Sequence, residues 1–200
     1  VLLAALIGAI IWTLFTWWRG IPSSSSHALI GSLVGAVLVY TVSAQHIIWS
    51  GVVTKVIIPL FTSPVLGLII GFLCMKLIYR AFAKWSNGQV NTLFLKLQIF
   101  SSAFVAFSHG NNDAQKTMGI ITLSLVTGGL LEAGSGVPFW VKISCAVVMA
   151  LGTSLGGWKV MKTMGSGVTK LTPASGFAAQ TSSALVIELM TFLGAPVSTT

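Results

Sequence analysis

The sequence predicts an all-α, polytopic membrane protein with inverted repeats and broken or re-entrant helices. Of its 200 residues, 54% are hydrophobic and only 7% are charged, whereas a soluble domain carries about 25% charged residues. Apolar stretches recur along the chain, each close to the roughly 20 residues that cross the hydrocarbon core of a bilayer. Short polar runs rich in Gly, Pro, Ser and Asn separate these stretches. Together these observations favour about six or seven membrane segments, interrupted at polar sites.

Apolar segments account for most of the chain. We predict membrane helices over 1–18, 28–44, 56–79, 92–107, 114–131, 139–157 and 174–193. The stretch 45–55 is predicted to be a short loop. Pro59 and Pro64 fall near the start of the helix that follows, where helix breakers are tolerated. Cys74 and Cys145 both lie in apolar helices, so no disulfide framework is expected.

The net charge of +8 comes from basic residues that gather in loops. Two predicted cytoplasmic loops are marked by Lys76, Arg80, Lys84 and Lys96, and by Lys159, Lys162 and Lys170. The loop 132–138 holds no Lys or Arg, so we place it outside. This distribution follows the positive-inside rule. It indicates a multi-pass protein of the lipid bilayer, and not a partner of nucleic acid. We expect its location to be a prokaryotic cytoplasmic (inner) membrane.

Two hydroxyl-rich runs share one pattern. Segments 20–26 and 194–200 each follow an apolar helix with Gly, a small or apolar residue, Pro, and then Ser or Thr residues. A half-helix N-terminus with free N–H groups and hydroxyl donors suits a tetrahedral anion, although either run alone is equally compatible with a surface loop or an N-cap. If 92–131 crosses the membrane once, an odd number of crossings separates the copies. The second copy is then inverted relative to the first, as in many secondary transporters.

A second polar cluster, 108–119, lies between apolar runs, and we expect the helix to break at 108–113. Asp113 is one of only three acidic residues, and an intramembrane charge costs at least about 2.5–3.5 kcal/mol. Asn and Asp oxygens suit a small hard cation. Lys116, three residues later, can pair with Asp113 on one helix face. The alternative is that the two residues merely neutralise each other.

Three further ionisable residues have open roles. His27 and His109 sit beside the polar runs, where a hydrogen-bonded packing role is favoured over proton transfer. Glu188 interrupts the last apolar run. It either faces a polar cavity or is neutral, and the sequence does not decide between these states.

These motifs resemble those of the PiT family of inorganic phosphate transporters, which carries a Gly-x-Asn-Asp signature and a Pro-x-Ser-x-Thr-His type motif in each of two inverted halves. Residues 110–113 are similar to the second-half signature. Residues 22–27 are similar to the first-half hydroxyl motif, and 196–200 to the second-half one, ending before its expected His. The three motifs occur in the family's order, and the resemblance covers essentially the whole chain.

The resemblance implies a single membrane domain built from two repeats. Residues 1–90 would be the C-terminal part of the first inverted repeat, and 91–200 most of the second. The first-half Gly-x-Asn-Asp signature would lie upstream of Val1. Because the chain also lacks an initiator Met and stops inside a motif, we expect a fragment.

The resemblance also implies roles for individual residues. Donors to the phosphate oxygens would be Ser24, Ser25, Ser26, Ser198, Thr199 and Thr200. Asn112 and Asp113 would bind the coupling cation, with Na⁺ favoured over H⁺. Accessory positions would be Asn111, Lys116, Thr117, Gln180 and His109. Gln180 stands where some family members have Glu; it cannot carry charge, which counts against proton coupling there.

Other functions remain to be weighed against phosphate transport. The nearest is a sulfate permease of the same fold, because hydroxyl donors distinguish the two anions poorly. A passive channel would lack dependence on a cation gradient. An intramembrane serine hydrolase using a Ser of 23–26 with His27 or His109 is disfavoured, since no Gly-x-Ser-x-Gly elbow is present. We therefore expect no enzyme and no cofactor beyond the coupling ion, with the oligomeric state, a homodimer included, left open.

Overall fold

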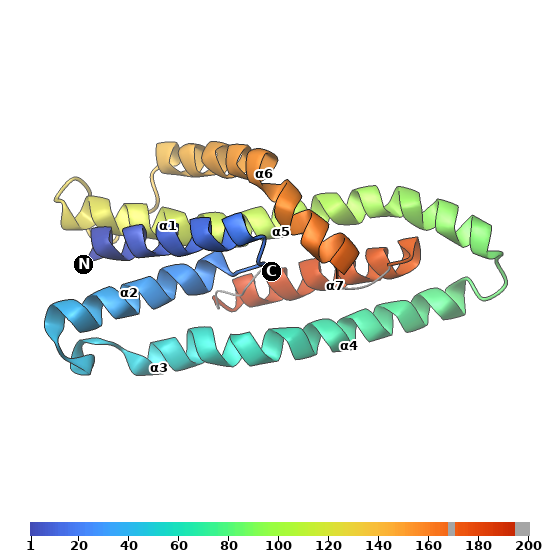
Figure 1. Cartoon of the computed structure of the whole chain (residues 1–200), viewed down its shortest axis with the longest axis horizontal. Coiled ribbons are helices and arrows are strands. Elements are labelled where there is room, and N and C mark those ends of the chain that lie inside the picture. The colour runs from blue at the N-terminus through green and yellow to red at the C-terminus, as the bar shows by residue number, and fades with distance from the viewer. Residues whose placement is uncertain (168–170, 195–200) are drawn as a thin grey trace.

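A computed structural model of the chain describes residues 1–167 and 171–194, apart from the side chains of 156, 159, 160 and 163–167. The described residues form helices and no strands, packed into an elongated bundle (Figure 1). The helices are α1 (Leu2–Arg19), α2 (Ser25–Thr41), α3 (Trp49–Val52), α4 (Ile58–Ala81), α5 (Asn87–Thr127), α6 (Phe139–Gly167) and α7 (Pro173–Phe192). The predicted all-α class is confirmed.

Three helical stretches of the described residues are long and apolar enough to cross a membrane: α1, the stretch Trp49–Ala81, and α5. Helices α2 and α6 contain shorter apolar stretches. Large hydrophobic side chains cover the outside of the bundle, for example Leu3, Phe72 and Phe100, which are 64–74% exposed. Such a surface requires lipid as its solvent.

The predicted loop at 45–55 is wrong over most of its length. After a short 3₁₀ turn at Ala44–His46, the chain is helical from Trp49, and a π-helical turn at Val53–Ile57 leads directly into α4. Pro59 lies at the start of α4 and has no N–H to donate to the preceding turn, so a widened turn can be accommodated there. Pro59 therefore follows a widened helical turn and does not end the helix.

The predicted break at 108–113 is also wrong, because α5 runs without interruption through 41 residues, about 60 Å at the usual helical rise. Gly110 costs only about 1 kcal/mol inside a helix. The neighbouring polar side chains bond along the helix, with His109 reaching Asp113 and Gln115 reaching Asn111, four residues apart in each case. Polar composition alone therefore did not require a break.

The break after α1 is real and forms a helical hairpin. Gly20 takes a left-handed conformation (φ 69°), and the N–H of Ile21 donates to the Thr16 carbonyl at 2.9 Å. This is a common way to end a helix, because only Gly adopts that conformation without strain. Four residues later the chain enters α2, with Ser24 as its N-cap.

Helix α7 packs in parallel against α5 and antiparallel against α4. The Phe94 and Phe177 rings lie 5.2 Å apart, and further along both helices the Ser101 hydroxyl donates to Gln180 Oε1 at 2.5 Å. On the other side of α7, Val186 and Met190 pack against Leu66 and Ile70. These contacts hold α7 in a fixed register with α5.

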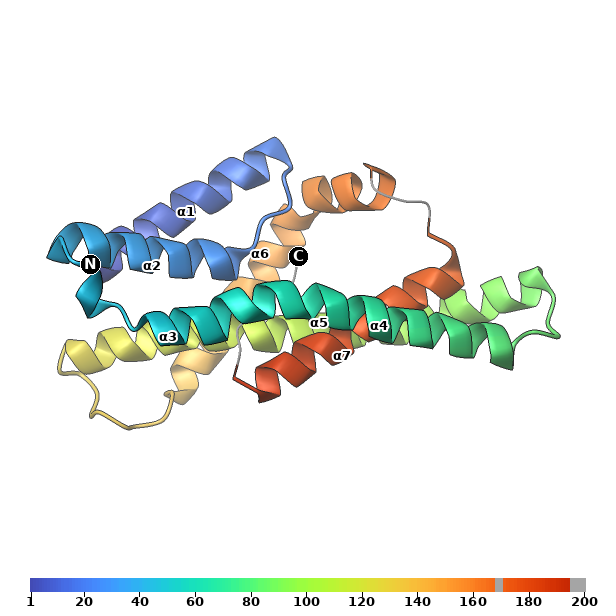
Figure 2. The same ribbon diagram turned by 90° about the horizontal axis from the view of Figure 1, so that it is seen from below.

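The helices before the two hydroxyl runs approach the middle of the bundle from opposite ends. Figures 1 and 2 both show α1 running inward from one end and α7 running inward from the other. Each ends in a left-handed glycine, Gly20 (φ 69°) after α1 and Gly194 (φ 62°) just after α7. The shared ending supports the sequence similarity of the two runs.

Replacing Gly20 should destabilise the hairpin. We expect Gly20→Ala to cost about 1–2 kcal/mol, because a Cβ is strained in the left-handed conformation. The melting temperature of the purified full-length protein should therefore fall. Gly31→Ala is the matched control: Gly31 lies within α2 with open space around its Cα, so this change should leave the melting temperature unchanged or raise it. Equal losses in both variants would contradict the role assigned to Gly20.

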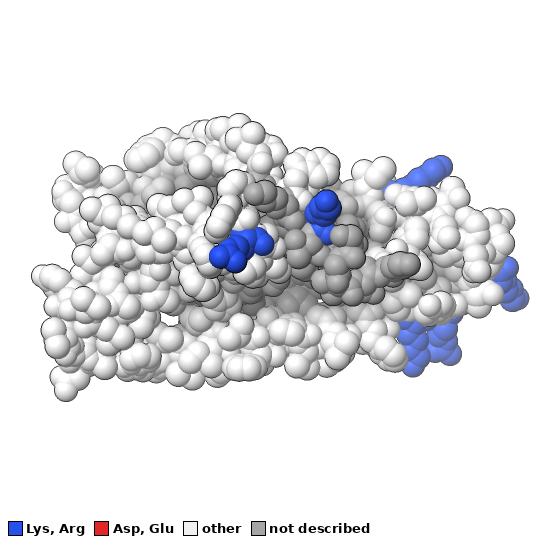
Figure 3. All heavy atoms as spheres, viewed as in Figure 1, with Lys and Arg blue, Asp and Glu red and all other residues white. Residues whose placement is uncertain are grey.

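Many of the Lys and Arg side chains visible in Figure 3 lie at one end of the molecule, and others lie near its middle. The basic residues predicted to face the cytoplasm at that end are Lys76 and Arg80 on α4, Lys84 in the connection, and Lys96 on α5. The two helices and their short connection thus place these charges together, as expected for a loop in contact with water and lipid headgroups.

Candidate functional site

The centre of the site is Lys116, which joins the hairpin to α5. Its ammonium donates to the Ser26 hydroxyl at the start of α2 and to Asp113 Oδ1 at 3.1 Å, within α5. Ser26 is only 3% exposed. A single cation therefore ties the first hydroxyl run to the second polar cluster, which lie 90 residues apart in the chain.

Asp113 is held on both of its oxygens. Oδ1 accepts from Lys116, and Oδ2 lies 3.0 Å from His109 Nε2. The side chains of Asp113 and Lys116 are 15% and 16% exposed, against 44% for His109. The carboxylate and ammonium compensate each other inside an apolar bundle, where either charge alone would be costly.

The first hydroxyl run forms the N-terminus of α2. Ser24 accepts from the backbone N–H of His27 at 3.3 Å, and its hydroxyl lies 2.8 Å from His27 Nδ1. Ser23 pairs with Thr16 of α1 at 2.7 Å, and Ser25 is exposed. Since the first N–H groups of a helix lack partners within it, this terminus presents backbone donors and hydroxyls together.

Both histidines take part in local hydrogen bonds, as the sequence analysis favoured. His27 belongs to the cap of α2, and its short distance to Ser24 is an ordinary contact across one helical turn. His109 orients Asp113. Capping of α2 therefore explains the short distance between Ser24 and His27. This contact is not evidence for a serine hydrolase.

The remaining polar residues of the 108–119 cluster on α5 differ in burial and in hydrogen-bond partners. Asn112 is 3% exposed and faces the bundle interior. Asn111 accepts from Gln115 Nε2 at 3.3 Å, and the Thr117 hydroxyl donates to the Asp113 carbonyl at 3.5 Å. Asn112 is therefore the most deeply buried carboxamide of this cluster.

Gln180 lies apart from this cluster. It accepts from Ser101 at 2.5 Å and donates to Ser102 at 3.0 Å. Ser101 precedes Asp113 by twelve residues on α5, which corresponds to about 18 Å of helix. The structure therefore assigns Gln180 to the α5–α7 contact, and does not bring it together with Asp113.

The second hydroxyl run, with Ser198, Thr199 and Thr200, lies outside the described residues. The chain is described up to Gly194, directly before this run. In the α5–α7 register set by Ser101 and Gln180, Gly194 falls at the level of residue 115 of α5.

Lys55 is a residue that the sequence analysis missed. Its ammonium donates to the Leu193 carbonyl at 3.2 Å, at the end of α7. A cation at a helix C-terminus complements the helix dipole. The signal in the sequence is a lone Lys in a largely apolar stretch, within the segment 45–55 that the sequence predicts as a loop.

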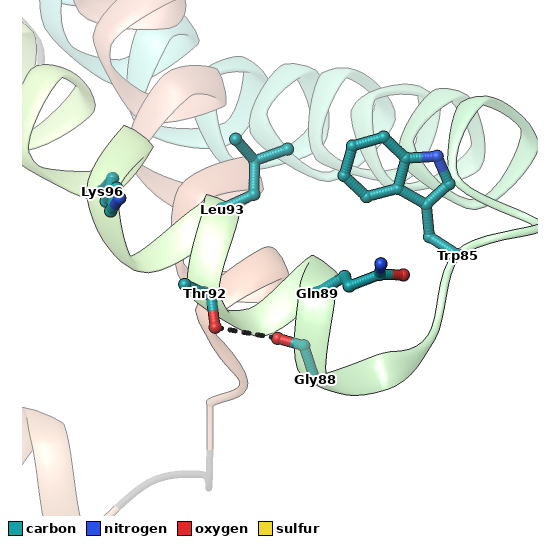
Figure 4. Close-up of a pocket in the computed structure, with 6 residues that line it drawn as sticks. All are labelled: Trp85, Gly88, Gln89, Thr92, Leu93 and Lys96. Atoms are coloured by element: carbon teal, nitrogen blue, oxygen red, sulfur yellow. Dashed lines mark hydrogen bonds between the residues drawn. The ribbon is translucent and has the colours of Figure 1, made fainter.

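A separate hollow of about 440 Å³ lies at the α4–α5 end of the bundle. Figure 4 shows its lining residues: Trp85 lies in the connection before α5, and Gln89 and Lys96 lie along the first turns of α5. Lys96 precedes Asp113 by 17 residues, about 25 Å along the helix. This hollow is therefore distinct from the candidate site.

Comparison with known proteins identifies the relatives of the chain. Residues 1–200 match the model of the Phosphate transporter family. A "Probable low-affinity inorganic phosphate transporter" of Mycobacterium bovis is 46% identical over 98% of this chain and 47% of its own length. Proteins of the same description from Rhizobium meliloti and Bacillus subtilis are 46% and 42% identical over the whole chain, and 59% and 60% of their lengths.

One solved structure, described as "The sodium-dependent phosphate transporter", shares the fold. It superposes with a TM-score of 0.85 at 24% identity, over 99% of this chain and 66% of its own. The chain spans about half to three fifths of the length of these curated relatives.

Proposed function

The chain belongs to the phosphate transporter family, and on that premise we propose that the full-length protein carries inorganic phosphate across the membrane by cation-coupled secondary transport. The observation that carries the proposal is the link from the hydroxyl-bearing N-terminus of α2, through Lys116, to Asp113. It places anion donors, a cation and a carboxylate at one level of the bundle.

Phosphate would bind at the N-terminus of α2. Ser24, Ser25 and Ser26 offer hydroxyls, the first turn offers backbone N–H groups, and the helix dipole is positive at that end. Lys116 already donates to Ser26 and adds a full positive charge. Ser198, Thr199 and Thr200 would complete the donor set from the inverted run.

Asn112 and Asp113 would bind the coupling cation, for which we propose Na⁺ ahead of H⁺. Phosphate carries between one and two negative charges near pH 7, and moving it alone into an apolar bundle is prohibitive. The Asp113–Lys116 pair is neutral as a whole. An additional cation beside the anion is therefore needed, which couples the two fluxes.

Alternating access would use the two halves, 1–90 and 91–200, as inverted repeats. The opposed approach of α1 and α7, each ending in a left-handed glycine, supports this assignment. In transporters of this kind, one repeat rocks against the other around a fixed site.

Uptake of labelled phosphate by the full-length protein in proteoliposomes tests the proposal. We expect uptake that depends on an inward Na⁺ gradient and falls to background when choline replaces Na⁺. Excess sulfate should compete weakly. Strong competition by sulfate would support the sulfate permease instead, and uptake without any cation gradient would indicate a passive channel.

A further inference from the structure

Three buried side-chain oxygens in the described part of the chain have no hydrogen-bond partner: Ser108 Oγ, Glu188 Oε1 and Thr191 Oγ1. Ser108 is fully buried, with 0% exposure. Buried polar atoms are nearly always paired, because an unpaired one costs roughly 1–3 kcal/mol. Three such atoms on two contacting helices call for a common explanation.

The parallel register of α5 and α7 places these oxygens at one level. Phe94 contacts Phe177, and Ser101 bonds Gln180. Ser108 lies seven residues after Ser101 on α5, and Glu188 lies eight residues after Gln180 on α7. Because both helices rise about 1.5 Å per residue, Ser108 and Glu188 reach nearly the same height.

The helical faces agree with this placement. Ser108 lies two turns after Ser101, on the same face of α5, which is buried along its length and also carries Asn112. On α7, Thr191 lies three turns after Gln180, and Glu188 lies one turn before Thr191. The three unpaired oxygens therefore line the α5–α7 contact beyond the Ser101–Gln180 bond.

The chemistry of this set is that of a ligand shell for a hard cation. A carboxylate oxygen and two hydroxyl oxygens offer lone pairs, and hydroxyls can also bind with their oxygen toward a metal. Among the described residues no group of three His, Cys, Asp or Glu side chains could hold a metal ion. The set therefore suits an alkali cation better than a transition metal.

We propose that Ser108, Glu188 and Thr191 form a monovalent-cation site of Na⁺ size between α5 and α7, distinct from the pair of Asp113 and Lys116. Asn112 lies one turn after Ser108 and directly before Asp113 in α5. A cation bound there balances the charge of Glu188 inside the bundle and fastens the end of α7 to α5. Its part in transport rests on the proposed function, but its binding does not.

The test measures Na⁺ binding to purified full-length protein in detergent, through the rise in melting temperature as NaCl replaces choline chloride at constant ionic strength. A ligand that binds the folded state raises stability with its concentration. For Glu188→Gln we expect the midpoint of the Na⁺-dependent rise to shift at least about tenfold upward, which corresponds to about 1.4 kcal/mol. Ser108→Ala and Thr191→Val should give smaller shifts in the same direction.

Glu132→Gln is the matched control, since it makes the same change at an exposed carboxylate outside the helices. Its Na⁺ midpoint should equal that of the unmodified protein. An unchanged midpoint in Glu188→Gln would overturn the site. Because this readout needs no phosphate, failed Na⁺-driven uptake by the unmodified protein would overturn the proposed function separately.

Discussion

Asp113→Asn should abolish phosphate uptake by the full-length protein while leaving it inserted in the membrane. The substitution keeps the size of the side chain but removes the negative charge of the carboxylate, whose two oxygens contact Lys116 and His109. If Asp113 supplies about 2.8 kcal/mol to cation binding, Na⁺-dependent uptake at limiting Na⁺ falls about 100-fold. Initial rates of labelled phosphate uptake, normalised to protein in the membrane, measure this loss.

The control for this experiment is again Glu132→Gln, a carboxylate-to-amide change in a loop, which should transport normally. Uptake by Asp113→Asn with an unchanged Na⁺ dependence would remove Asp113 from the coupling site. Loss of the protein from the membrane fraction would instead show that Asp113 acts in folding.

Lys116→Met should damage both stability and transport. It removes the ammonium that pairs with Asp113, whose side chain is only 15% exposed. Breaking a buried ion pair costs about 3–5 kcal/mol. It also removes the contact with Ser26, which connects the hairpin to α5. We expect a lower melting temperature and uptake at background.

A double variant separates these two effects. Asp113→Asn combined with Lys116→Met removes both charges, so much of the lost stability should return while uptake stays absent. Lys142→Met, an exposed lysine on α6, is the control and should change neither property. Recovery of uptake in the double variant would contradict a role for this pair in transport.

The sequence predicted most of the fold because a bilayer leaves few choices. Long apolar stretches must be helical to satisfy their backbones, and the all-α membrane fold and the phosphate transporter family are confirmed. The hairpin break was predictable from Gly20 and Pro22, which disfavour a continuous helix. The predicted integral membrane location is likewise confirmed, by the long apolar helices and by the bacterial relatives.

The two wrong predictions, the break at 108–113 and the loop at 45–55, both concern polar or Pro-containing segments that remain helical in the structure. The polar run of α5 stayed helical because its side chains bond four residues along the same helix. The segment before Pro59 stayed helical through a π-helical turn. Neither outcome is visible in residue types alone, since both depend on which partners the backbone brings within reach.

For the site, some contacts between residues could be predicted from the sequence and others could not. The pairing of Asp113 with Lys116 was anticipated from their spacing, and it is confirmed. The bond from Lys116 to Ser26 could not be predicted, because it joins segments 90 residues apart. The partnerless oxygen of Glu188 was likewise visible only once α7 was packed on α5. The roles in binding phosphate and cation remain predictions.

The most direct test of the central claim is to locate the anion. Arsenate is a heavier isostere of phosphate, and its arsenic atom gives anomalous diffraction in crystals of the full-length protein grown with Na⁺. We predict an arsenic peak at the N-terminus of α2, within hydrogen-bond distance of the Ser24–Ser26 hydroxyls and next to Lys116. A peak at the basic end of the bundle near Arg80 and Lys84, with none at α2, would contradict the account.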